Sequence, residues 1–368
     1  MLSTIAFIFV LSFLVIVHEL GHFIVAKLCK VRVEIFSLGF GKKLLSFKTG
    51  DTEYRLSLIP FGGYIKVTGE NPEEKREGAA WEFLSKTVGQ RAAIIFAGPA
   101  FNYVFAFLLF SCVFYSGMPH LASRIGEVRA GYPAYTAGIK AKDKIISIDG
   151  KKIRFWDEVS QIIHKKTEHE GIVVQLEREE KVLSLSVITT SETVKNLFGQ
   201  EVKIGLIGIS PSNEVILVRY GMGESFKLAL LQVVKLTKIT AIALYKMLTG
   251  QMSARESITG PVGIFYITGE AAKLGFVYLL QLMGVLSVSL AIINLFPLPV
   301  LDGGHLLFLF FEKIKGRPLS FKTQELAARI GLSLIVTLMV FIFYNDFIRF
   351  GIFDKIAKIF TNNFTPRP

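Results

Sequence analysis

Cysteine and charge are both scarce in this sequence of 368 residues. Only two cysteines exist, Cys29 and Cys112, and neither belongs to a CxxC pair, so there is no disulfide framework and no thiolate zinc site. Charged residues make up 20% of the chain, hydrophobic residues 51%, and the mean hydropathy is +0.48. This composition excludes a disordered chain and argues against an ordinary soluble enzyme.

Long runs without charge account for the hydrophobic surplus. They cover residues 1–17, 92–118, 274–301 and 330–345. Because about 20 apolar residues span the hydrocarbon core of a membrane, we predict four transmembrane helices, the first and last borderline in length. The first run is not a convincing signal peptide, since it has no basic n-region and no small-residue cleavage site.

The net charge of +12 indicates contact with membrane lipid rather than nucleic acid, because the basic residues lie between the apolar runs and form no nucleic-acid module. Residues 27–91 carry 12 Lys and Arg and residues 302–329 carry five, which predicts that both are cytoplasmic. The N-terminus is then outside, and residues 119–273 face the exterior or periplasm. The tail, 349–368, is discordant: it is basic, yet this topology puts it outside.

Between the apolar runs the pattern changes. Residues 31–68 alternate in polarity and are punctuated by glycine, which predicts a small membrane-associated sheet of β-hairpins. Residues 122–190 are predicted to be mixed strand and helix, with a turn at Asp149-Gly150. Residues 225–248 interleave lysines with apolar residues, which predicts a basic amphipathic helix on a membrane surface.

The motif HELGH ends the first apolar run. His18 and His22, four residues apart, point to one side of a helix and can bind one zinc ion, with Glu19 beside them to take a proton from water. The alternative is a helix end with two interfacial histidines. Ionisable residues beside an apolar run are costly and usually functional, which favours the metal. Seventeen residues precede the motif, about 25 Å of a core about 30 Å thick, so the site is predicted inside the membrane near its cytoplasmic face.

A catalytic zinc usually has three protein ligands and one position for water. His120, His164 and His169 fall in the region predicted to lie outside, across the membrane from the motif. Asp302 ends the third apolar run, which crosses in the same direction as the first, so it should reach the same depth and is the predicted third ligand. Alternatively, it caps the helix that follows. His305 is expected to lie behind the ligands or on the surface.

The residues just before Asp302 interrupt a membrane helix. The run NLFPLP contains two prolines, each of which removes a donor and clashes with the preceding turn. Freed backbone groups persist in a membrane only where protein buries them or where they line a wet cavity. Asn294 is therefore predicted either to hydrogen-bond a substrate backbone or to cap the broken helix.

Several motifs together carry a resemblance to a known family. They are HELGH, GFG, PFGGY, GPAFN and NxxPxPxLDGG, at residues 18–22, 39–41, 60–64, 98–102 and 294–304. Together they resemble the bacterial site-2 protease family of intramembrane zinc metalloproteases, in its regulator-of-sigma-E protease branch, over nearly the whole chain. The resemblance implies that His18, His22 and Asp302 bind zinc. It also implies that Glu19 is the catalytic base and that Asn294 handles the substrate.

A second resemblance lies in the exterior region. Residues 125–150 are similar to the PDZ domains of bacterial envelope proteases, which bind extended peptide by adding it to a sheet edge. The alternative is a generic small α/β domain. Members of the family often carry two tandem PDZ domains, whereas residues 190–273 show no second copy of the pattern, so a two-domain size filter does not carry over.

A membrane-spanning substrate must be unwound before its peptide bonds can be attacked. We hypothesise that residues 31–68 reach the active site and pair with the substrate as an added strand, with Leu56 and Leu58 contacting it and Asn294 holding it open. Two alternatives remain: a non-catalytic PDZ membrane scaffold with a structural zinc, and a zinc transporter. Glu19 opposes the first, and spans without charged residues or histidine oppose the second.

The predicted protein is thus an α-helical polytopic membrane protein with four transmembrane helices, a membrane-associated β-hairpin sheet and an inserted α/β PDZ domain. We expect a zinc endopeptidase of the bacterial inner membrane, with its N-terminus and PDZ domain periplasmic; the resemblance implies an anti-sigma factor or remnant signal peptides as substrates. The segments are 1–26 (first span with HELGH), 27–91 (β-rich cytoplasmic or re-entrant loop), 92–118 (second span), 119–212 (PDZ), 213–273 (amphipathic helical), 274–301 (third span with LDGG), 302–329 (cytoplasmic loop), 330–348 (fourth span) and 349–368 (tail).

Overall fold

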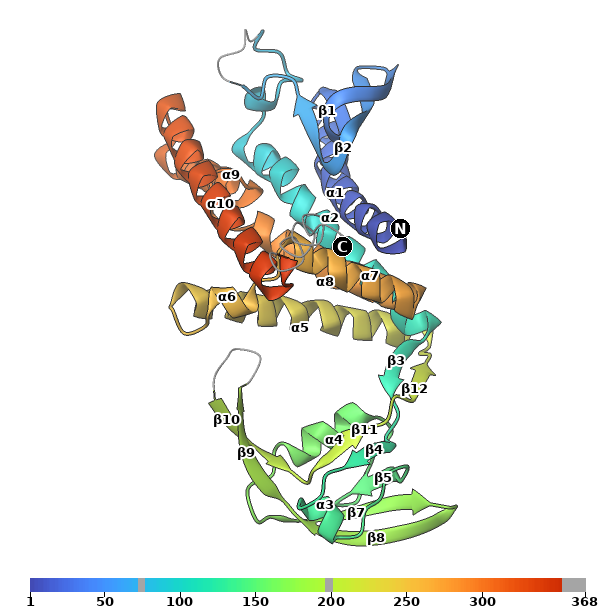
Figure 1. The fold of residues 1–368 in the computed structure, drawn as a ribbon. Coiled ribbons are helices and arrows are strands. Elements are labelled where there is room, and N and C mark those ends of the chain that lie inside the picture. Colours follow the sequence, from blue (N-terminus) through green and yellow to red (C-terminus); the bar gives the residue numbers. More distant parts are fainter. Residues whose placement is uncertain (72–76, 196–200, 353–368) are drawn as a thin grey trace, which may run out of the picture. The chain divides into compact units, whose positions relative to one another are not determined.

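The computed structural model describes residues 1–71, 77–195 and 201–352 (Figure 1). The chain divides into two compact units. We call the first the membrane unit; it comprises residues 1–113, 223–245 and the chain from 254 onward. The second, the inserted unit, comprises residues 114–222 and 246–253.

Long apolar helices dominate the membrane unit. Three of these helices pack together through one buried cluster of apolar side chains. The cluster contains Val10 and Leu14 of the first helix, Leu109 of the second and Met283 of a third. The helices from the N-terminus onward are α1 (Leu2–Leu28), α2 (Val88–Ser116), α5 (Met222–Leu248), α6 (Ala254–Ser257), α7 (Pro261–Leu274), α8 (Phe276–Asn294), α9 (Asp302–Lys315) and α10 (Phe321–Arg349), with a short 3-10 turn at Phe83–Ser85.

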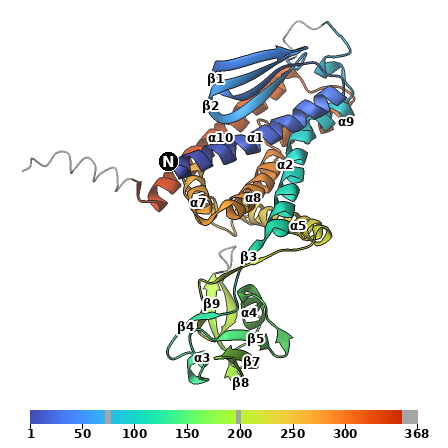
Figure 2. The same cartoon turned by 90° about the vertical axis from the view of Figure 1, so that its right-hand side faces the viewer.

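Strands β1 (Val33–Thr49) and β2 (Thr52–Val67) form the sheet of the membrane unit, which lies along α1 (Figure 2). Both strands are bent, so the pair folds into four antiparallel segments in the order 43–49, 52–57, 33–38 and 63–67. Segments 43–49 and 63–67 are the two edges of this sheet among the described residues. Val33 and Val67 pack with Ala26, Val31 and Ile94, which fixes the sheet against the ends of α1 and α2.

The inserted unit is built from short strands and two short helices. Its largest sheet has the order β6-β5-β7-β8, and the hairpin between β5 and β6 turns at Asp149 and Gly150, both with positive φ, as the sequence predicted. Ile145, Val174 and Trp156 belong to its buried core. Its elements are β3 (Met118–Leu121), β4 (Ile125–Val128), α3 (Pro133–Thr136), β5 (Lys144–Ile148), β6 (Lys151–Lys152), α4 (Trp156–Ile163), β7 (Gly171–Arg178), β8 (Lys181–Ile188), β9 (Thr190–Lys195), β10 (Glu201–Leu206), β11 (Ile209–Pro211) and β12 (Val215–Val218).

The described residues contain five helices that are long and apolar enough to cross a membrane, where the sequence predicted four. The additional one is α5, which was expected to lie on a membrane surface. It is long and apolar enough to cross because its lysines are widely spaced among apolar residues. The predicted class, a polytopic helical membrane protein with a sheet-rich region, is confirmed. The expected interruption before Asp302 is also present, since α8 ends at Asn294.

Candidate metal centre

Three side chains from two helices meet at one point in the membrane unit. His18 and His22 lie one turn apart on α1, and Asp302 is the first residue of α9. The Nε2 atoms of the two histidines are 3.2 Å apart, and Oδ2 of Asp302 lies 3.1 Å from Nε2 of His18 and 3.6 Å from Nε2 of His22. Both histidines are buried, and the structure brings together the three residues that the sequence predicted as ligands.

The spacing of these three atoms fits a zinc ion. Tetrahedral coordination with bonds of about 2.0–2.1 Å places ligand atoms about 3.3–3.4 Å apart, close to the separations observed here. In addition, Oδ2 of Asp302 is buried without a hydrogen-bond partner among the described residues. A buried carboxylate oxygen that faces two imidazole nitrogens and accepts no hydrogen bond needs a positive charge nearby. A divalent cation bound by these three atoms would supply it.

Each histidine has a second contact through Nδ1. Nδ1 of His22 lies 2.8 Å from the backbone carbonyl oxygen of Ile94, which requires a proton on Nδ1 and leaves Nε2 available as a ligand atom. Nδ1 of His18 lies 3.2 Å from Nδ2 of Asn102, a fully buried residue of α2. The sequence singled out neither Ile94 nor the side chain of Asn102 as part of the site.

Two glycines allow α1 and α2 to approach closely at this site. A Cβ on Gly98 would lie 2.3 Å from Nε2 of His22 and 2.8 Å from Cε1 of His18, so its hydrogen side chain leaves the ligand atoms their space. A Cβ on Gly21 would lie 2.4 Å from the carbonyl oxygen of Ala97. Small residues let membrane helices pack at backbone contact, and here that contact brings α2 beside both histidines.

The glycines that follow Asp302 position its carboxylate. The first turn of α9 packs against the loop after α8, and a Cβ on Gly303 or Gly304 would lie 2.2 Å from the carbonyl oxygen of Leu295 or Leu298, respectively. The loop itself turns tightly, with the amide of Leu298 donating to the carbonyl of Phe296 at 2.7 Å. The LDGG segment therefore packs against the loop that follows α8, and this packing places Asp302 beside α1.

Two further groups face the metal site. Nδ2 of Asn294, at the end of α8, lies 3.5 Å from Nε2 of His18. Glu19 lies under the edge segment 63–67, since a Cβ on Gly63 would come within 3.2 Å of its Cγ. An amide and a carboxylate therefore both lie at the site, beside the candidate ligand atoms.

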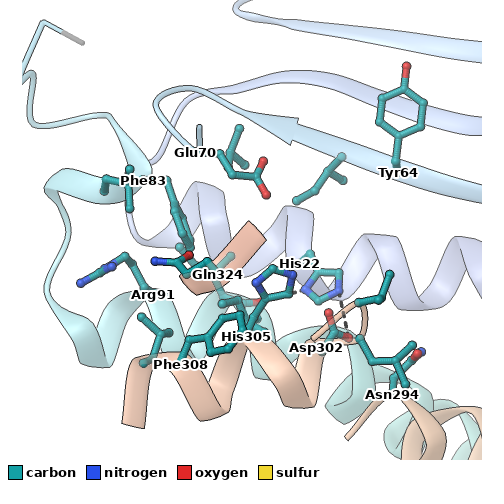
Figure 3. A pocket seen from close by; sticks show the side chains of 18 of the residues that line it. His22, Tyr64, Glu70, Phe83, Arg91, Asn294, Asp302, His305, Phe308 and Gln324 are labelled. Carbon is teal, nitrogen blue, oxygen red and sulfur yellow. Dashed lines mark hydrogen bonds and ion pairs between the residues drawn. The ribbon is translucent and has the colours of Figure 1, made fainter. Parts of the chain in front are cut away.

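The metal site opens into a cavity of about 690 Å³. Figure 3 shows His22, Asp302 and Asn294 near one end of this pocket and Arg91 and Phe308 toward the other. Tyr64, Ile65 and Val67 of the edge segment line this cavity, as does Glu19. Apolar side chains supply much of the rest of its wall, among them Phe83, Leu84, Ile95, Leu309 and Phe321.

Arg91 closes one part of the pocket wall by an ion pair. Its guanidinium donates to both carboxylate oxygens of Glu312, with Nη1 at 3.2 Å from Oε2, and its Nε donates to the carbonyl of Lys86. Arg91 is buried, and the pair joins the start of α2 to α9. Bidentate pairs of this kind fix both distance and orientation.

The structure does not bring every predicted residue to the site. Leu56 and Leu58, predicted to contact substrate, do not line the pocket, and Leu56 is paired on both sides, with Leu38 and with Leu45. A strand paired on both sides has no free edge, so Leu56 offers substrate no edge to pair with in this sheet. The edge beside the pocket is 63–67, and the expected contact at Leu58 stays a prediction. His305, left open by the sequence, lines the pocket.

A centre built from two histidines and an aspartate, in a unit of apolar helices, defines a membrane-embedded metalloenzyme as the class of protein. Comparison with known proteins gives the family. Residues 6–338 match the family model "Peptidase family M50", and the chain belongs to this family. It is a zinc metalloprotease of the site-2 protease type and a multi-pass protein of the inner membrane.

Named relatives align with this chain over almost its entire length. The Agrobacterium fabrum protein named "Putative zinc metalloprotease Atu1380" is 36% identical, over 92% of this chain and 94% of that protein. The Escherichia coli protein named "Regulator of sigma-E protease RseP" is 33% identical, over 94% of this chain and 98% of that protein. That alignment runs over 451 residues and this chain has 368, so the Escherichia coli protein contains at least 83 residues without a counterpart here.

Solved structures that match cover about a quarter of the chain. The PDZ domain of an SdrC-like protein from Listeria monocytogenes is 22% identical, over 24% of this chain and 84% of that one, with a TM-score of 0.20. The corresponding domain from Listeria innocua is 24% identical, over 25% and 96%, with the same TM-score.

Proposed function

We propose that the protein is an intramembrane endopeptidase that cleaves transmembrane segments of other membrane proteins. The observation that carries this proposal is the cluster of ligand atoms on α1 and α9 inside a unit of apolar helices. In this proposal His18, His22 and Asp302 bind the zinc ion and Glu19 is the catalytic base. Bound zinc supplies Lewis-acid chemistry, which polarises a peptide carbonyl and makes water a nucleophile at neutral pH.

Glu19 would handle the protons of the reaction. It follows His18 directly on α1, so its carboxylate starts from the same turn as the ligands but leaves the helix at a different angle. From there it accepts a proton from the attacking water and then delivers it to the leaving amine.

Substrate would be held as an extended strand on the edge segment 63–67. This segment lines the pocket beside Glu19, and its outer edge has no strand partner among the described residues. A peptide added to an open sheet edge satisfies its backbone groups with hydrogen bonds, which replaces those lost when a transmembrane helix unwinds. Asn294, whose Nδ2 lies 3.5 Å from Nε2 of His18, would donate to the substrate backbone and keep it extended.

The orientation follows from the basic segments and from the fold of the membrane unit. The proposed topology has the N-terminus and the inserted unit in the periplasm and the metal site near the cytoplasmic face. Asn294 at the end of α8 lies beside His18 in the second half of α1, so α1 and α8 would both run inward. The chain after α8 is then cytoplasmic and α10 runs outward.

Helix α7 supports four crossings rather than five. One part of it lies against the start of α1, with the rings of Phe265 and Phe7 5.5 Å apart, and its first turn binds Asp346 near the end of α10. Both contacts are at the periplasmic ends of their partners in this topology. With 14 residues, α7 is about 21 Å long and cannot span a core of about 30 Å. Since α5 begins and ends on the same side, it would lie in the interface, with its lysines toward anionic headgroups.

Substrate classes come from the resemblance and from the relatives' names. An anti-sigma factor or remnant signal peptides are the candidates we propose for cleavage. We also infer that the inserted unit is a single PDZ domain that binds extended peptide; residues 131–139 and 143–150 carry the sequence pattern that supports this.

Replacing Glu19 tests the proposal. Wild type and Glu19→Gln are expressed with a single-span membrane protein, and we expect the substrate fragment only with wild type, although both variants should bind zinc. His18→Ala should lose both zinc and cleavage. Equal processing by wild type and Glu19→Gln would contradict the assigned role of Glu19, and zinc-loaded but inactive wild type would favour a peptide-binding scaffold.

A further inference from the structure

Asn102 contacts the metal centre but belongs to none of the groups assigned above. It lies on α2, it is fully buried, and its Nδ2 atom is 3.2 Å from Nδ1 of His18. Its backbone carbonyl accepts a hydrogen bond from Oγ of Ser287 on α8, at 2.8 Å, so the residue is held at the junction of three helices. Its amide oxygen, Oδ1, is buried and has no hydrogen-bond partner among the described residues.

The two nitrogens of His18 cannot both carry a proton when the residue binds a metal. A neutral imidazole that binds a cation through Nε2 must keep its proton on Nδ1, and that proton needs an acceptor. The amide of Asn102 faces Nδ1 at 3.2 Å, and an asparagine amide can present its oxygen at this position as the acceptor.

We propose that Asn102 is the positioning residue of the metal centre, whose amide oxygen accepts a hydrogen bond from Nδ1 of His18 when zinc is bound. Oδ1 has no other partner among the described residues, so it is available for this bond. His22 has a different arrangement, because the backbone carbonyl of Ile94 accepts from its Nδ1. One ligand is therefore oriented by a backbone acceptor and the other by the amide of a side chain.

The inference rests on the proposed ligand set, and zinc affinity tests it without reference to cleavage. In the Glu19→Gln background, Asn102→Leu keeps the branched shape of the side chain and removes the acceptor, so we expect zinc affinity to fall about 10- to 100-fold. Asn102→Asp retains an acceptor oxygen and should bind zinc about as tightly as the parent. Ser287→Ala, which removes only the hydrogen bond to the Asn102 carbonyl, is the packing control and should not change affinity.

The absorption spectrum of the Co²⁺-loaded protein gives a second readout. Misorientation of His18 should shift the visible bands in Asn102→Leu and leave them unchanged in Asn102→Asp. Unchanged affinity and spectrum in Asn102→Leu would overturn the inference. If Asn102→Leu does not fold, Asn102→Asp is the test, and weak zinc binding by the folded Asp variant would overturn the inference. His18→Ala separates the two proposals: if it binds zinc normally, the ligand set is wrong, whereas a loss there but not in Asn102→Leu overturns only the role of Asn102.

Discussion

At the scale of single residues, Gly98 shows how little space separates α2 from the proposed metal ligands His18 and His22. Every side chain larger than hydrogen places an atom 2.3 Å from Nε2 of His22. His22 cannot simply move away, because its Nδ1 is bound to the carbonyl of Ile94 on the same helix as Gly98. The ligand geometry therefore depends on a glycine that has no chemistry of its own.

We expect Gly98→Ala to lose zinc and to abolish cleavage. The added methyl group displaces a ligand atom or separates α1 from α2, and overpacking of this kind costs about 1–3 kcal/mol. The matched control is Gly89→Ala in the same helix, where an added Cβ meets no atom within 4 Å. Zinc content of the purified variants is the measurement, and a zinc-loaded, active Gly98→Ala enzyme would show that the two helices pack more loosely than described.

The chemistry of the site was predictable from sequence to the extent that it follows from spacing along one element. The pair His18 and His22 is one helical turn apart, and Asp302 was reached by counting membrane crossings. Asn102 and the carbonyl of Ile94 were missed as contacts because they depend on how α2 crosses α1, and no periodicity in the sequence encodes that crossing. Gly98 lay within a recognised motif, but only the structure shows which atoms it accommodates.

At the scale of elements, the sheet of β1 and β2 shows that alternation of polar and apolar residues predicts strands but not how the strands pair. The pattern around Leu56 correctly indicated strands, but it could not show that both strands bend and pair twice. This double pairing makes 52–57 an inner segment and leaves 63–67 as the edge at the pocket. Register depends on bulges and bends, which the alternation of side chains does not specify.

We expect substrate to cross-link to edge 63–67 and not to the opposite edge. In a Glu19→Gln protein without native cysteines, Tyr64→Cys should form a disulfide with a cysteine near the cleavage site of a single-span substrate, since cross-strand partners approach within about 5.5 Å. The matched control is Leu45→Cys on edge segment 43–49. Gel mobility under oxidising conditions reports the product, and equal yields at both positions would argue against strand addition beside Glu19.

At the scale of the whole molecule, composition and fold give different counts of membrane crossings. Five helices among the described residues are apolar enough to span a membrane. The contacts of α7 with α1 and α10 favour an even number of crossings between α2 and α8, so α5, the one candidate between them, would not cross. Hydropathy alone does not separate these cases, because α5 is the least hydrophobic of the five helices, with four lysines among its 27 residues, and is still apolar enough to span.

We expect Gly250, after α5, and Gly316, between α9 and α10, to lie on opposite sides of the membrane. Both glycines are exposed, both have positive φ (72° and 69°), and an added Cβ meets no atom within 4 Å at either, so Gly250→Cys and Gly316→Cys carry the same backbone strain. In a protein without native cysteines, a membrane-impermeant maleimide should label position 250 in intact spheroplasts and position 316 only after lysis. If α5 crosses the membrane, the bilayer separates position 250 from the outer reagent, and it would label like position 316.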